Sequence, residues 1–317
     1  MIGTIFKTFG RKYMDVTLRT GDDYVVRIVE RPGLWMDDAA LGALSADLRT
    51  IAGRTLKAGN LTYGVFSGKK ERMGAVIITL VSRRDGTPVA FNALAVMALD
   101  TAPHPTDVLH LGLVMVDPDE RSKNLSWVLY GLTCFLIFFR RQFRPVWVSN
   151  VTQVPAVVGM VANMFSDVWP SPRDGRRTLN HLLLAREIME THRHVFGVGD
   201  KAGFDEERFV ITDAYTGGSD DLKKTWETAP KHRDESYNIF CKEALDYVRG
   251  DDVLQLGQMD LAAMRTYLTR EVPKSAVIGL LLTGGLVALR RIVLPAIHWA
   301  DTTRGWSILR PYKVRGK

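Results

Sequence analysis

The chain has 317 residues, of which 46% are hydrophobic and 24% are charged, and its two cysteines are too few for a disulfide framework. This composition excludes collagen-like, low-complexity and globally disordered chains, because enough apolar side chains are present to bury a core. Six of the seven net positive charges lie in the last 28 residues, so the rest of the chain is close to neutral and no nucleic-acid partner is expected. The first residues lack the apolar core of a secretory signal, which favours a cytoplasmic protein.

Apolar periodicity in the first 170 residues predicts strands that alternate with helices. Strands are expected at residues 24–30, 61–66, 75–81, 89–97, 108–116 and 145–151. Helical spacing is found at residues 36–51, 125–141 and 155–165. The pair Asp85-Gly86 between two of the strands is typical of a hairpin, because glycine tolerates the positive φ of a tight turn. We therefore expect the three strands between residues 75 and 116 to be antiparallel neighbours.

Beyond residue 170 the predicted elements are mostly helical. Helices are expected at residues 174–195, 237–247 and 260–268, with a strand at 208–215 and a long polar loop at 217–236. Proline and glycine at 170–175 favour a boundary between the two parts of the chain. His192 and His194 are two residues apart in or just after a helix, where side chains so spaced point apart, so no metal site is expected.

Residues 114–126, with the sequence VMVDPDERSKNLS, carry the clearest chemical signal. A predicted strand ends here and a helix begins, and the N-terminus of a helix offers free backbone N–H groups and partial positive charge to a pyrophosphate. Arg121 and Lys123 bring cations to the same place. Asn124 tolerates left-handed φ, and Ser126 is small enough to let an anion approach the backbone. The alternative is an ordinary strand-to-helix turn with solvated charges.

The loop Arg121-Ser122-Lys123-Asn124-Leu125-Ser126 resembles the acyl-CoA-binding motif of the GNAT superfamily of N-acetyltransferases. Asn124 stands where the family usually has glycine, and Ser126 occupies the family's second small position. The order of predicted elements from residue 24 to residue 165 is also similar to that of the superfamily. The similarity covers a little under half of the chain.

The resemblance implies an α/β (α+β) fold, in which a mixed, mostly antiparallel acetyltransferase-type sheet is flanked by helices, with a mostly helical C-terminal extension. It implies an acyltransferase in which an amine or hydroxyl of a small-molecule or lipid acceptor directly attacks the thioester of acetyl-CoA or a longer acyl-CoA, with no metal. The sheet would open along residues 108–116, where the main chain of Val114, Met115 and Val116 would pair with the pantetheine amides. The implied acyl-CoA loop consists of Arg121, Ser122, Lys123, Asn124, Leu125 and Ser126.

A second motif departs from the family pattern. The superfamily often has an asparagine and, seven residues later, a tyrosine that protonates the leaving thiolate, whereas this chain has Gln153 and Met160. His110 is the candidate base, because an unperturbed histidine titrates near neutrality, and Asn92 and Tyr130 are further catalytic candidates. Two alternatives remain: His110 as an ordinary core or surface histidine, and a non-catalytic GNAT-fold binding or scaffold protein.

Residues 275–289 form an uncharged run between Lys274 and the pair Arg290-Arg291. A helix of this length spans roughly 22 Å, short of the ~30 Å hydrocarbon core, so a membrane-spanning helix is not expected. Three roles stay open: a helix at an anionic membrane surface, a homodimer contact, and a core helix with outward-facing arginines. The chain is thus expected to divide into a GNAT-like acyl-CoA-binding domain (1–170), a substrate-side or accessory extension that completes the fold (171–274), and an apolar helix with a basic tail (275–317).

Overall fold

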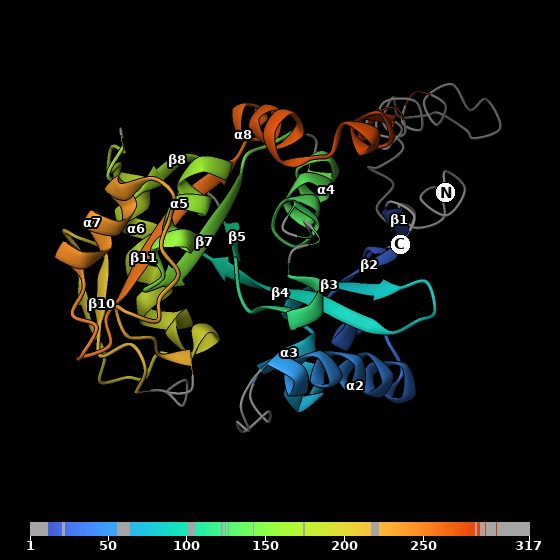
Figure 1. Ribbon diagram of the computed structural model, residues 1–317, viewed down its shortest axis with the longest axis horizontal. Coiled ribbons are helices and arrows are strands. Elements are labelled where there is room, and N and C mark those ends of the chain that lie inside the picture. The colour runs from blue at the N-terminus through green and yellow to red at the C-terminus, as the bar shows by residue number, and fades with distance from the viewer. Residues whose placement is uncertain are drawn as a thin grey trace, which may run out of the picture.

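The computed structural model describes residues 12–20, 23–55, 64–100, 105–121, 123, 125, 127–141, 143–173, 175–216, 222–282, 284, 285, 289 and 296. Its centre is a sheet of eleven strands. Figure 1 shows helices on both sides of this sheet. The strands are β1 (Asp15–Thr20), β2 (Tyr24–Glu30), β3 (Val76–Arg83), β4 (Pro88–Leu99), β5 (Thr106–His110), β6 (Val114–Val116), β7 (Val146–Thr152), β8 (Ser166–Trp169), β9 (Gly203–Asp205), β10 (Val210–Thr212) and β11 (Asp252–Met259).

The strand order in the sheet is β1-β2-β3-β4-β5-β7-β11-β10-β9, with β6 beside β4 and β8 beside β11. Among these described strands, every pairing is antiparallel except that of β5 with β7. A parallel pair needs a crossover connection, and here the crossover is the helical segment between β6 and β7. The sheet is therefore mixed and mostly antiparallel.

Helices cover both faces of the sheet. They are α2 (Asp38–Thr55), α3 (Lys70–Met73), α4 (Thr133–Arg140), α5 (Pro155–Met164), α6 (Leu179–Glu187), α7 (Glu235–Ala244) and α8 (Leu261–Thr266). Figure 1 shows α2 and α3 on one side of β3 and β4, and α4 with α8 on the other. One apolar core joins α4, α5 and α8 to the sheet, a second joins α2 and α3 to its opposite face, and a third lies under α6.

Local sequence patterns account for the first half of the fold. The 24–30 and 36–51 predictions are confirmed as β2 and α2, and the three predicted neighbouring strands are confirmed as β3, β4 and β5 with β6. The predicted hairpin turn is also confirmed, because Gly86 has φ 91° and the N–H of Arg83 donates to the carbonyl of Thr87 at 2.9 Å. Predictions for α4, β7 and α5 are confirmed within a few residues.

Several expectations are wrong or incomplete. Residues 64–66 of the expected strand at 61–66 belong to a 3₁₀ helix, Gly64–Ser67, and residues 61–63 lie outside the described residues. The helix expected from 174 begins only at Leu179, after the N-cap residue Thr178, and the strand expected at 208–215 is the three-residue β10. The extension also holds β11, a strand that the periodicity did not predict and that pairs with β7. Residues 171–274 therefore contribute strands to the sheet and are not only helical.

Candidate functional site

The parallel pair β5–β7 holds together over only three residues of each strand. Val108–His110 pairs with Trp147–Ser149, and the N–H of Leu111 then donates to the carbonyl of Ser149 at 2.7 Å. Beyond Leu111 the chain turns away from β7 and continues beside β4. The turn is at Gly112, where a Cβ would clash with the carbonyl oxygen of Ala93. The following strand, β6, pairs with β4 and not with β7. The described sheet therefore opens between β6 and the end of β7.

Backbone groups point into this opening from both sides. On β6, the carbonyl of Leu113 and the N–H of Asp117 bond to β4, so by strand alternation the groups of Val114 and Val116 face away from β4. On β7, the carbonyl of Ser149 faces β5, so the groups of Val151 face the same way, toward β6. In the sheet register Val114 and Val116 lie opposite Asn92 and Ala90 of β4, and Val151 lies opposite Leu254 of β11. By strand alternation these are the positions whose N–H and C=O groups point away from that neighbour and toward the opening.

The loop after β6 is anchored by a buried carboxylate. Glu120 is 3% exposed, accepts a hydrogen bond from the Tyr24 hydroxyl and accepts a second from Nε of Arg83 at 2.9 Å. Burial raises the pKa of Glu120, but the hydrogen bonds from Tyr24 and Arg83 outweigh it and hold this pKa below its usual range. Arg121 is exposed, while Lys123 lines a pocket of about 530 Å³ together with Glu120 and Tyr24.

The structure places some of the predicted loop residues and not others. Arg121, Lys123 and Leu125 are described, and Leu125 is buried in the core beneath α4. Ser122, Asn124 and Ser126 lie outside the described residues. The helix that follows begins with a π-helical turn, Trp127–Leu132, which continues directly into α4. The strand, loop and helix thus follow one another in the expected order.

Two buried side chains hold the π-helical turn in place. The amide of Asn92 on β4 donates to the carbonyl of Leu129, and the hydroxyl of Tyr267 donates to the carbonyl of Trp127 at 2.9 Å. Gly131 is needed between them, because a Cβ there would lie within 2.8 Å of three atoms of the Tyr267 ring. The other side-chain atom of Asn92, Oδ1, is buried with no hydrogen-bond partner in the described residues.

The three predicted catalytic residues do not converge. Asn92 and Tyr130 lie on the α4 side of the sheet, where the half-buried Tyr130 belongs to the π-helical turn and burial raises its pKa to about 12. His110 lies on the opposite side, where its ring packs against Phe196 with centroids 5.0 Å apart. Its Nδ1 lies 3.1 Å from the Ser149 hydroxyl, and burial lowers the pKa of His110 to about 4. His110 is therefore a neutral, buried histidine at physiological pH.

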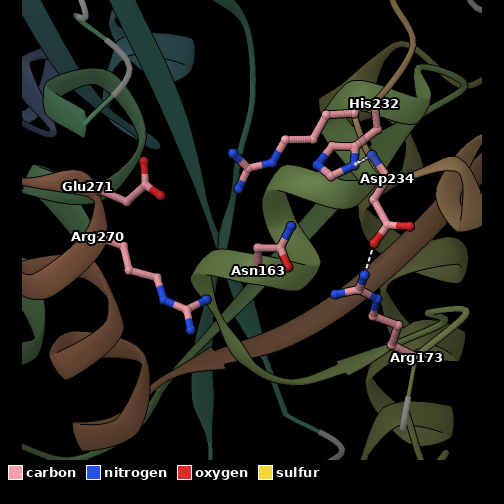
Figure 2. Close-up of a pocket in the computed structure, with 7 residues that line it drawn as sticks. Asn163, Arg173, His232, Asp234, Arg270 and Glu271 are labelled. Atoms are coloured by element: carbon pink, nitrogen blue, oxygen red, sulfur yellow. Dashed lines mark hydrogen bonds and ion pairs between the residues drawn. The ribbon is translucent and has the colours of Figure 1, made fainter.

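A second pocket, of about 760 Å³, lies between α5 and the π-helical segment Tyr267–Glu271 that follows α8. Figure 2 shows side chains that reach it from three directions: one from α5 in the centre, two from the segment after α8, and the rest from loops on the other side. Its lining residues are Asn163, Arg173, His232, Arg233, Asp234, Arg270 and Glu271. No sequence motif joins these residues, because they come from four separate stretches of the chain.

Neither a scan against models of protein families nor a search of curated proteins finds a match to this chain. Within the described residues, no group of three or more His, Cys, Asp or Glu side chains is arranged to hold a metal ion. Among the described helices, none is both long enough and apolar enough to cross a bilayer.

Proposed function

We propose that the protein is a divergent member of the GNAT superfamily, an acyltransferase that takes acyl groups from acetyl-CoA or a longer acyl-CoA. The observation that carries this proposal is the opening of the sheet after the parallel pair β5–β7. It occurs along the same main chain, Val114–Val116, that the resemblance assigns to the pantetheine amides. The mixed sheet and the strand–loop–helix order around residues 108–140 support the same assignment.

The unpaired backbone groups give the opening its binding chemistry. Each amide of pantetheine has an N–H donor and a C=O acceptor. These groups can hydrogen-bond to the backbone of Val114 and Val116 as a neighbouring strand would. The pyrophosphate would then reach the loop at Arg121–Ser126, where exposed Arg121 and the nearby Lys123 supply positive charge. The start of the helix adds backbone N–H donors at the same end.

The reaction is a direct transfer. A lone pair on the amine or hydroxyl of the acceptor attacks the thioester carbonyl carbon, the new C–N or C–O bond forms, and the C–S bond breaks to release the CoA thiolate. The acceptor loses one proton and the thiolate gains one. Tyr130 is protonated at neutral pH, so its hydroxyl can give a proton to the thiolate and recover one from the acceptor, in place of the tyrosine that Met160 replaces. Burial raises the pKa of Tyr130 to about 12, which makes it a weaker proton donor than an ordinary tyrosine.

A non-catalytic protein of the same fold is the second candidate, and two observations favour it. His110 is buried, and its pKa of about 4 makes it a weak base at neutral pH. Met160 has no proton to donate. A thiol-release assay with short and long acyl-CoAs and pooled amines and alcohols separates the two candidates: release that depends on an acceptor supports the transferase, and CoA binding without any release supports the binding protein.

Binding of CoA at the loop is tested by calorimetry. We expect wild-type protein to bind CoA, and Ser126→Glu to weaken binding by about tenfold or more, because the new carboxylate repels the pyrophosphate and competes for helix N–H groups. Arg121→Gln should weaken it by about tenfold, whereas Arg144→Gln, at an exposed arginine outside the loop, should leave it unchanged. Equal binding by all four proteins would place the site elsewhere, and no binding by wild type would contradict the use of CoA.

A further inference from the structure

The arginine-lined pocket between α5 and the segment after α8 has an excess of positive charge. Arg173, Arg233 and Arg270 line it, against the carboxylates of Asp234 and Glu271. Asp234 is already engaged, because it forms an ion pair with Arg173 and accepts the N–H of Ser236 at the start of α7. Arg233 and Arg270 form no ion pair within the described residues. Two guanidinium groups are therefore available to a ligand.

The loop that carries Arg233 is held rigidly. The buried amide of Asn238 accepts the N–H of His232 at 2.8 Å and donates to the carbonyl of the same residue at 3.0 Å. The His232 ring lies against α5 at Gly159, where a Cβ would fall within 2.8 Å of three ring atoms. This clamp fixes the direction in which the loop presents its side chains, and a preorganised site loses less entropy on binding.

The imidazole adds a donor to the same pocket. Burial, together with the charges of Arg233 and Arg173, lowers the pKa of His232, which favours the neutral ring. Its Nδ1 accepts the N–H of Asp234 at 3.0 Å, so the ring proton sits on Nε2. Asn163, one turn after Gly159 on α5, contributes an amide that can also donate. Four lining side chains can therefore donate, those of Arg233, Arg270, His232 and Asn163, against one lining carboxylate, that of Glu271, that is outside an ion pair in the described residues.

We propose that this pocket binds the phosphate group of a phosphorylated ligand, held by Arg233 and Arg270 with the Nε2–H of His232 as a further donor. Guanidinium groups match the oxygens of a phosphate in geometry and charge, and the forked donors of two arginines can hold a dianion between them. The pocket lies on the α4 side of the sheet, next to α5. Its ligand is either a phosphate of the acyl-CoA donor or a separate phosphorylated molecule.

Binding of inorganic phosphate to the full-length protein tests the site. We expect phosphate to bind in calorimetry and to raise the melting temperature, and Arg233→Gln and Arg270→Gln each to weaken binding by about tenfold, the loss of one charge-assisted contact. Arg144→Gln is the matched control and should bind as wild type does. Melting curves recorded without phosphate show whether each variant is folded, and Arg270→Lys should recover part of the affinity because it restores the charge.

Two results would overturn the proposal: wild-type protein that does not bind phosphate, or an Arg144→Gln variant that loses as much affinity as the pocket variants. Competition identifies the source of the phosphate. If CoA displaces inorganic phosphate, the pocket serves the donor; if both bind together, it serves another phosphorylated ligand. If wild-type protein binds inorganic phosphate but does not bind CoA, the proposed function is refuted while the phosphate site is supported.

A different observation concerns the last described helical stretch, residues 274–282 with 284, 285 and 289. Its inner side packs on α4: Leu280 is 7% exposed, and a Cβ at Gly284 would lie within 3.0 Å of three atoms of the Phe139 ring. Its outer side carries exposed apolar residues three, four and eleven positions apart, which is the spacing of one helix face. These residues are Ile278, Leu281, Leu282 and Leu289, each at least 49% exposed.

We infer that this outer face lies on an anionic membrane surface. The sequence is uncharged from residue 275 to residue 289; Lys274 precedes it, and the sequence that follows carries a net positive charge of six. An apolar helix face flanked by basic residues enters the headgroup boundary of a bilayer, and the basic residues are attracted to acidic lipids. The charge of the tail selects a membrane over a second copy of the chain, because two such tails repel one another.

Vesicle flotation tests this surface with the full-length protein. We expect binding to vesicles that contain phosphatidylserine at low salt, weaker binding at high salt, and little binding to phosphatidylcholine alone. Replacing Leu281 and Leu282 together by asparagine should reduce binding by about tenfold or more, while Val248→Asn, at an exposed residue elsewhere, should not. Absence of binding at low salt, or equal binding of the double variant, would overturn the inference, and concentration-dependent dimers lost in that variant would identify a second copy as the occupant.

Discussion

Gly131→Ala is expected to lower the free energy of unfolding by about 3 kcal/mol, because the added methyl group has no room against Tyr267. A Cβ at this position would lie within 2.8 Å of three ring atoms of Tyr267. The ring is fully buried, packs against Phe135 with centroids 5.8 Å apart, and donates its hydroxyl to the carbonyl of Trp127. It therefore cannot move aside without losing this hydrogen bond and its core contacts. Urea denaturation at equilibrium measures the change.

Gly42→Ala provides the matched control for this substitution. Gly42 lies on the exposed side of α2, and a Cβ there would meet nothing within 4 Å. The same change should stabilise the protein by up to about 1 kcal/mol, because alanine forms helix more readily than glycine. Tyr267→Phe should cost about 1 kcal/mol, the value of its hydrogen bond alone. If Gly131→Ala unfolds at the same urea concentration as wild type, the close packing of Tyr267 on the π-helical turn Trp127–Leu132 is refuted.

The elements predicted from sequence are those whose apolar pattern is local. The hairpin of β3 and β4 combines two apolar runs with Asp85-Gly86, and α2 shows a plain helical period. β11 was missed because Gln255 and Gly257 interrupt its apolar pattern in the centre of the sheet. Gln255 is fully buried, and its amide bonds to Asn150 and to the carbonyls of two residues at least 85 positions away. These hydrogen bonds offset the cost of burying the Gln255 amide, and they form only in the folded chain, so the sequence around Gln255 does not indicate them.

In the candidate site too, some features could be expected from one segment of sequence and others depend on the complete fold. The opening beside Val114–Val116 was implied by the resemblance of one continuous strand and loop segment to the GNAT superfamily, and β6 there pairs only with β4 among the described strands. That His110 and Asn92 lie on opposite sides of the sheet could not be predicted, because facing depends on register and a shift of one residue reverses it. The arginine-lined pocket could not be predicted at all. Arg173 and Arg270 are brought together only after β11 returns the chain to the centre of the sheet.

Asp252→Asn is expected to change how stability depends on pH. Asp252 is 5% exposed, and burial raises its pKa to about 7, although the Tyr215 hydroxyl donates to it at 3.0 Å and opposes part of that rise. An aspartate in the unfolded chain has a pKa of about 3.9, so between pH 4 and 7 the folded protein binds the proton more tightly. The contribution of Asp252 to the free energy of unfolding is therefore full at low pH and lost as pH rises to 7.

His110 acts in the opposite direction over part of this range. Its pKa is lowered to about 4, so the folded protein binds fewer protons than the unfolded chain below about pH 6.5, and stability from this residue rises with pH. Between about pH 4 and 6.5 the free energy of unfolding of wild type therefore falls with pH through Asp252 and rises with pH through His110. The quantity to measure is therefore the difference between Asp252→Asn and wild type, because the contribution of His110 cancels in it.

That difference should be constant below pH 4 and should then move in favour of Asp252→Asn by up to roughly 4 kcal/mol as pH rises through 7, since each unit of pKa shift is worth about 1.4 kcal/mol. Urea denaturation at intervals from pH 4 to pH 8.5 gives the curve. Tyr215→Phe provides a second check: it removes the hydrogen bond that favours the carboxylate, so the fall in stability should extend to higher pH than in wild type. A difference between Asp252→Asn and wild type that does not vary with pH would show that Asp252 is ionised in the folded protein throughout the range.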